Sequence, residues 1–60
     1  MIYALEYSPS QKAFHRQVLT DAVKTNMEHY QEQKYFDWII IAVGTWEEMM
    51  ALGEKLQEEI

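Results

Sequence analysis

Hydrophobic positions along the chain fall into two short apolar runs, each followed by a stretch with helical spacing. Residues 1–7 are rich in β-forming side chains and end at a Ser-Pro pair, which predicts a strand. Residues 38–43 (Trp-Ile-Ile-Ile-Ala-Val) form a continuous apolar run, the pattern of a strand covered on both faces. Residues 9–33 predict one long helix between the strands, and residues 46–60 predict a second helix.

Both predicted helices have a recognisable start. Ser8 can cap the first helix, Pro9 suits the first helical position, and Gln11 completes a capping box. Thr45 and Glu48 repeat this arrangement before the second helix. The predicted element order is therefore strand, helix, strand, helix within the single domain that a chain of this length allows.

The connection between the strands determines the predicted topology. A long crossover that is mostly helical favours a parallel pair of strands. Two strands alone do not make a stable sheet. We therefore expect a small two-layer β-α-β-α domain of the α/β class, with the more apolar strand 38–43 in the centre and the sheet completed by dimerisation.

Apolar positions on the two helices indicate what each helix packs against. In helix 46–60 they form one stripe with Gly53 near its centre, where a missing side chain lets another backbone approach. In helix 9–33 they spread over a wider arc than one sheet contact needs, which predicts contact with a second copy. The expected dimer interface comprises Phe14, His15, Val18, Leu19, Asn26 and Tyr30.

Composition and charge narrow the classes of function. The chain has 60 residues and no cysteine, which excludes disulfides, thiolate metal sites and thiol nucleophiles. The net charge of −5 argues against binding to nucleic-acid phosphates or to an anionic membrane surface. No apolar run is long enough to span a bilayer and no export signal is visible, so we expect a cytoplasmic protein.

Candidate catalytic and metal-binding residues are few. His29 and Glu32 stand at i, i+3 and could share a metal ion, but a metal site needs further ligands, so a solvated pair is the better interpretation. Hydroxyl and N–H groups near Ser8 and Thr45 could hold an anion, yet Glu6 and two other glutamates crowd that edge, and capping explains these residues. No nucleophile motif is present. We therefore expect no enzyme activity, no cofactor and no metal.

His15 and Asn26 lie inside the apolar arc of the first predicted helix, nearly on one line. One interpretation places both at the rim of the core, where each polar group finds a local hydrogen bond. The other places them in a ligand cavity at a subunit interface, which predicts a small-molecule-sensing homodimer.

The last segment of the chain is strongly acidic. Glu54 and Glu58 are like charges at i, i+4, and Glu58 and Glu59 stand at a helix C-terminus, where the dipole disfavours anions. Such local conflict is often retained for function, although a solubilising face has the same pattern. The predicted partner-binding residues are Glu47, Glu54, Glu58 and Glu59, together with the aromatic residues Tyr35, Phe36 and Trp38.

Three functions follow from these patterns. The favoured one is a small non-catalytic adaptor or inhibitor that docks on a basic protein surface through acidic helix 46–60. A special case is mimicry of nucleic acid to inhibit a DNA-binding protein. The alternative is a small-molecule-sensing homodimer with a site near His15 and Asn26, and a minimal enzyme is the third.

Overall fold

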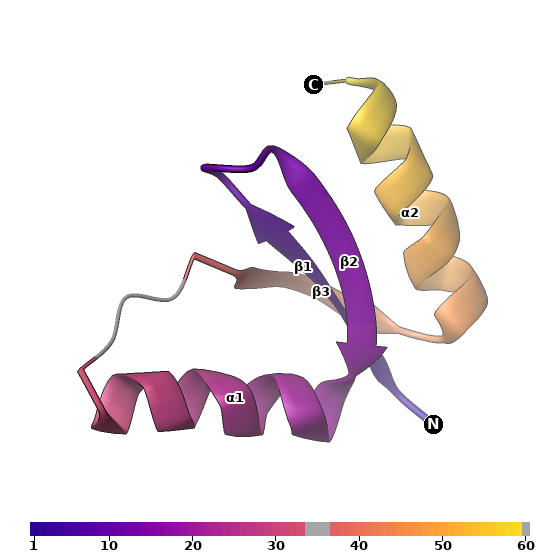
Figure 1. The fold of residues 1–60 in the computed structure, drawn as a ribbon. Helices are drawn as coiled ribbons and strands as arrows, with labels where there is room; N and C mark the ends of the chain where they lie inside the picture. Colours follow the sequence, from indigo (N-terminus) through magenta and orange to yellow (C-terminus); the bar gives the residue numbers. More distant parts are fainter. Residues whose placement is uncertain (34–36, 60) are drawn as a thin grey trace.

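The computed structural model describes residues 1–33 and 37–59, which form a mixed α/β fold (Figure 1). The elements follow in the order β1 (Tyr3–Ser8), β2 (Ala13–Val18), α1 (Leu19–Gln31), β3 (Ile39–Gly44) and α2 (Trp46–Glu58). The first strand, the last strand and the last helix lie close to their predicted positions. The segment between Ser8 and Leu19 does not.

A tight turn replaces the predicted start of the first helix. The Ser8 carbonyl accepts from the Lys12 N–H at 2.7 Å, which closes one helical turn, and the Gln11 N–H donates to Ser8 Oγ at 3.3 Å. The helix does not continue, because Lys12 adopts a φ of 53°, in the left-handed region, and the chain reverses into β2. The predicted cap therefore closes a single turn of a β-hairpin.

The predicted long helix is wrong over residues 13–18, which form β2 and pair antiparallel with β1. The Phe14 ring packs on the Tyr7 ring with centroids 4.8 Å apart. The Arg16 guanidinium lies over the Trp46 ring, 4.7 Å from its centroid. These contacts form only when β2 lies beside β1 and α2, and they override the helical spacing of the apolar residues in this segment.

The sheet has the order β2-β1-β3, and β1 is antiparallel to both neighbours. The predicted pair of parallel strands, with the strand near 38–43 in the centre, is therefore wrong. Burial agrees with the observed order, since Ala4, Leu5 and Glu6 of β1 are fully buried, whereas every residue of β3 is partly or largely exposed. The helical crossover does exist, because α1 joins β2 to β3, and these two strands run in the same direction on either side of β1.

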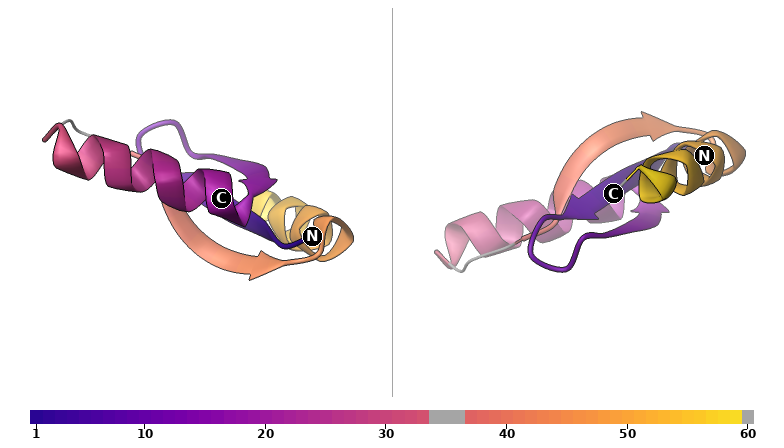
Figure 2. Two further views of the ribbon diagram at one scale, coloured as in Figure 1. Left: turned by 90° about the horizontal axis from the view of Figure 1, so that it is seen from below. Right: turned by 90° about the horizontal axis from the view of Figure 1, so that it is seen from above.

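The two helices lie at different places on the sheet. α2 runs along one face, whereas α1 lies crosswise at the end of the sheet where β2 finishes (Figure 1). In the views of Figure 2 the sheet and both helices form a thin slab, and the Cα atoms extend over 33 × 28 × 10 Å. The smallest dimension is about the width of three paired strands.

The start of α2 confirms the second predicted capping box. The Glu48 N–H donates to Thr45 Oγ1 at 3.1 Å, and the Thr45 N–H donates to Glu48 Oε1 at 2.9 Å. Gly53 is buried where α2 crosses β1, and a Cβ atom placed on it would stand 3.3 Å from Leu5 Cδ1. The glycine thus allows the close approach of a side chain, not of another backbone as its position in the sequence predicted.

Candidate binding surfaces

Glu6 is a fully buried carboxylate in the central strand β1. Its Oε1 accepts from Nε2 of His15 and from Nε2 of Gln17, both at 2.6 Å. The two side chains reach it because alternate residues of β2 share one face of the sheet with Glu6. Within residues 1–33 and 37–59, Glu6 Oε2 has no hydrogen-bond partner.

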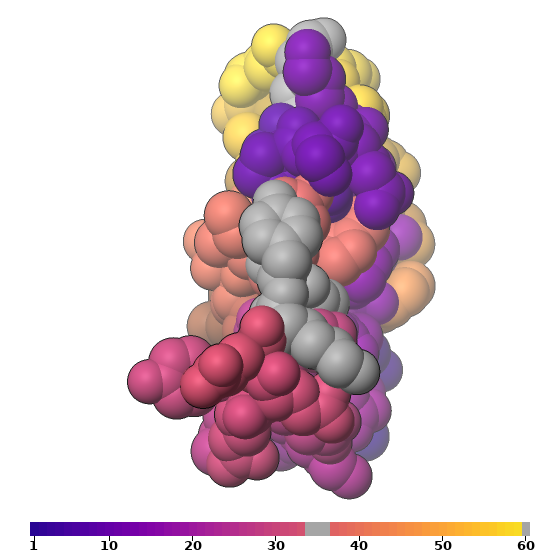
Figure 3. Space-filling view, turned by 60° about the vertical axis from the view of Figure 1, so that its left-hand side comes forward, coloured from indigo at the N-terminus to yellow at the C-terminus, as the bar shows by residue number. Residues whose placement is uncertain are grey.

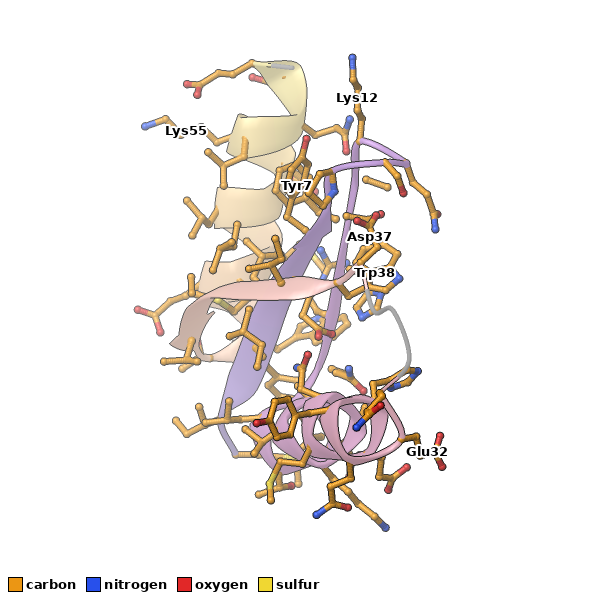
Figure 4. The ribbon with its side chains drawn as sticks, turned by 90° about the vertical axis from the view of Figure 1, so that its left-hand side faces the viewer. Tyr7, Lys12, Glu32, Asp37, Trp38 and Lys55 are labelled. Carbon is orange, nitrogen blue, oxygen red and sulfur yellow. The ribbon has the colours of Figure 1, made fainter. Side chains whose placement is uncertain are left out.

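The segment before β3 packs over this network. The Trp38 ring lies on the His15 ring, with centroids 4.2 Å apart and an interplanar angle of 31°. Asp37 Oδ2 accepts from the Ser10 N–H at 3.1 Å and from the hydroxyls of Ser8 and Ser10. Figure 4 shows Asp37 and Trp38 next to each other beside the β1–β2 hairpin. Trp38 is therefore part of the packing of the sheet.

An open groove of about 400 Å³ lies between α1 and β3. Asn26 is its polar lining residue, and Asn26 Nδ2 donates to the Ala22 carbonyl at 2.9 Å within α1. The apolar lining residues are Val23, Met27, Trp38, Ile39 and Ile40. Trp38 lines the groove together with Asn26 and also stacks on His15.

The other residues expected at a dimer interface do not share one surface. Phe14 and His15 are neighbours in a strand, so they point to opposite faces of the sheet. Val18 and Leu19 form the junction of β2 and α1, and Tyr30, near the end of α1, is 85% exposed. A helix would have placed these side chains on one arc, and the hairpin separates them.

The acidic side chains of α2 lie on its outer face. Met49 and Gly53 are buried against the sheet. Glu47, Glu54 and Glu58 are exposed on the opposite side of the helix, and the C-cap residue Glu59 is exposed as well. The structure therefore brings the predicted acidic residues together at the surface.

The aromatic part of the predicted docking surface does not join them. Tyr35 and Phe36 lie outside the described residues. Trp38 stacks on His15, on the face of the sheet away from α2, which packs on the face that carries Leu5 and Arg16. Trp38 and the acidic row therefore belong to different sides of the molecule.

The capping box at the start of α2 also lowers the pKa of Glu48. The Thr45 backbone N–H, and secondarily the Thr45 side chain, hold the pKa of Glu48 below its ordinary value by hydrogen bonding to the carboxylate. Glu48 thus stabilises the start of the helix, and its carboxylate is engaged by the Thr45 N–H.

His29 and Glu32 stand near the end of α1. His29 Nδ1 lies 2.8 Å from the Thr25 carbonyl. In the part of the chain that the structure describes, no three His, Cys, Asp or Glu side chains gather closely enough to hold a metal ion. No helix of this part is long and apolar enough to cross a membrane.

Sequence reasoning missed the network around Glu6. A lone carboxylate inside an otherwise apolar strand is a signal for a buried, paired acid. Its partners His15 and Gln17 could not be identified from spacing, because only the hairpin brings β2 beside β1.

No protein-family model, curated protein or solved structure matches the chain.

Proposed function

We propose that the chain is a small non-catalytic adaptor or inhibitor that docks on a basic surface of a partner protein through the acidic outer face of α2. The observation that supports it is the exposed row of Glu47, Glu54 and Glu58, opposite the side of α2 that packs on the sheet. A row of one charge sign on a folded surface accelerates association with a partner of opposite sign and favours it over others.

The packing of α2 holds this row in one orientation. Trp46, at the start of the helix, packs edge-on against Tyr3 with ring centroids 5.2 Å apart. The Arg16 guanidinium lies over the same Trp46 ring, 4.7 Å from its centroid. Lys55 is a cation on α2 itself, and Lys12 lies at the tip of the hairpin (Figure 4). The row therefore lies on a helix whose first residue is held against the sheet by Tyr3 and Arg16.

Affinity capture from an extract of the native host tests this proposal. The wild-type chain should retain a specific basic protein, and retention should fall as salt is raised. The double variant Glu54→Gln/Glu58→Gln should lose it. The matched control Asp21→Asn/Glu28→Gln removes the same charge from exposed positions on α1 and should retain it. Equal retention by all three chains would rule out docking through α2.

The groove between α1 and β3 favours a second candidate function, the sensing of a small molecule. Small-molecule sites combine an apolar lining with a few polar groups, as Asn26 among its apolar neighbours does. Trp38 joins this groove to the Glu6–His15 pair. A metabolite that raises the melting temperature of the wild type but not of Asn26→Leu would support this function. A broad metabolite panel without any such shift would contradict it.

A further inference from the structure

The two edges of the sheet differ in chemistry. The edge strand β2 contains His15, Arg16 and Gln17, so it carries polar and charged side chains. The opposite edge strand, β3, has the sequence IIIAVG without a charged or polar side chain. Proteins usually protect an edge strand with charges, proline or a covering element, because its free N–H and C=O groups recruit other strands. In Figure 2, β3 forms one margin of the slab.

The exposed side chains of β3 are large and apolar. Ile39, Ile41 and Val43 are 51%, 44% and 53% exposed. A register shift opposite Leu5 and Glu6 leaves Ile39 paired with Tyr7 and Val43 paired with Ala4, so the exposed side chains of β3 flank its free edge on both faces of the sheet. Exposed apolar edges of this kind mark a surface that another chain covers.

α1 carries further exposed apolar side chains, next to the groove that it shares with β3. Val23, Met27 and Tyr30 stand at i, i+4 and i+7 on one side of the helix, and all three are exposed. The groove lined by residues of both elements joins α1 to β3. Figure 3 shows the later part of α1 and the start of β3 on the same face of the molecule. We call the free edge of β3 and this side of α1 together the α1–β3 surface.

We propose that the α1–β3 surface binds a second copy of this chain, with the two β3 strands pairing antiparallel about a two-fold axis. The two three-stranded sheets then form one continuous sheet of six strands. A two-fold axis perpendicular to the sheet reverses the direction of a strand, so β3 and its copy pair antiparallel, and an uncharged strand meets its copy without repulsion. The acidic face of α2 takes no part, so this inference stands apart from the proposed docking.

A dimer interface of ordinary size is a modest part of the surface of this chain. A stable interface buries about 800 Å² per partner. That is about one fifth of the 4387 Å² accessible surface of the chain. A chain of 60 residues also buries a small core, here Ala4, Leu5, Ala22 and Met49 among its apolar residues, and dimerisation is a usual remedy for a core of this size.

Sedimentation across the micromolar range, with matched variants, tests the inference. The wild type should sediment as a dimer, and Ile41→Lys, which places a charge on the β3 edge, should sediment as a monomer. Gln57→Lys adds the same charge at an exposed position on α2 and should remain dimeric. Ile41→Thr keeps a β-branched side chain and should raise the dissociation constant about tenfold or more, since each change occurs twice in the dimer.

Amide hydrogen exchange supplies a readout that does not depend on any variant. The β3 amides that are not bonded to β1 should be protected at high concentration and should lose protection on dilution. A wild type that stays monomeric across the range would overturn the inference, as would a dimer that tolerates Ile41→Lys. Protection of β3 only after addition of a different apolar peptide would assign the edge to another chain and would also overturn it.

Discussion

His15 Nε2 lies 2.6 Å from Glu6 Oε1, so a partly exposed imidazole holds a carboxylate that has no exposed surface. A buried carboxylate is tolerated only when hydrogen-bond donors compensate its lost hydration. Here the two donors come from β2, through His15 and Gln17. The pair therefore couples the central strand to the hairpin partner that the sequence did not reveal.

This pairing predicts an asymmetric response to substitution. His15→Leu should lower the free energy of unfolding by about 1–3 kcal/mol, because it removes a donor from a buried charged acceptor. Adding Glu6→Met should recover part of this loss, because the double variant has no buried charge left to satisfy. Urea denaturation of both single variants and the double variant measures the coupling. Strictly additive losses would show that the two side chains do not interact.

Lys12 ends the single helical turn of the hairpin with a φ of 53°. The left-handed region costs a residue with a side chain about 1–2 kcal/mol, and glycine avoids this penalty. Lys12→Gly should therefore raise the free energy of unfolding by up to about 1 kcal/mol, whereas Gln11→Gly, one position earlier, should not raise it. Thermal melts of the two glycine variants compare them directly. If residues 9–33 were one helix, both glycines would destabilise the protein.

Signals that act within one helical turn were predicted better than contacts between separate elements. The Thr45–Glu48 capping box acts within one turn, and it is confirmed. The Ser8–Gln11 signal also produced its local hydrogen bond, but the signal contains nothing that continues the helix beyond Lys12. The local pattern therefore formed its hydrogen bond, but the helix that it predicted from residue 9 was wrong as far as residue 18.

The strand β2 shows why the remainder was not predictable. Phe14 and Val18 are spaced as on a helix face, and α1 follows β2 without a capping side chain that would mark a boundary. What makes this segment a strand is its partners. Tyr7 and Glu6 meet it across the hairpin, and Trp46 is distant in the sequence. Because β2 was not predicted, the sheet was expected to have two strands with β3 in its centre. The residues expected at one dimer interface also lie on different elements, since part of the predicted helix is β2.

Gly53 packs against Leu5 Cδ1, so a large side chain at this position must displace the centre of the sheet. Gly53→Leu should lower the free energy of unfolding by about 1–3 kcal/mol through overpacking, despite the better helix propensity of leucine. The control Ala51→Leu places the same side chain on the exposed side of α2 and should change stability little. Chemical denaturation measures the free energy of unfolding of both variants. A Gly53→Leu protein as stable as the wild type would refute the tight contact.

Glu48 gives the fold a defined dependence on pH. Hydrogen bonds from Thr45 hold the pKa of Glu48 below its ordinary value in the folded chain, so the ionised form favours folding. A depressed carboxyl pKa contributes stability above the pKa of the unfolded state, and this contribution disappears as the pH falls through the folded-state pKa. Glu48→Gln can retain a hydrogen bond from the Thr45 N–H, but it does not titrate.

The stability difference between the wild type and Glu48→Gln should therefore be constant at neutral pH and shrink as the pH falls below the ordinary glutamate value of 4.5. Other titrating groups are common to both chains and cancel in this difference. In a Thr45→Ala background, which should itself cost about 1 kcal/mol through loss of the cap, the pH-dependent part should become smaller, because one of the two interactions with the Glu48 carboxylate is gone. Thermal unfolding of the four chains at neutral and acidic pH measures all of these terms. A wild-type advantage over Glu48→Gln that is as large in acid as at neutral pH would show that the carboxylate charge does not stabilise the start of α2.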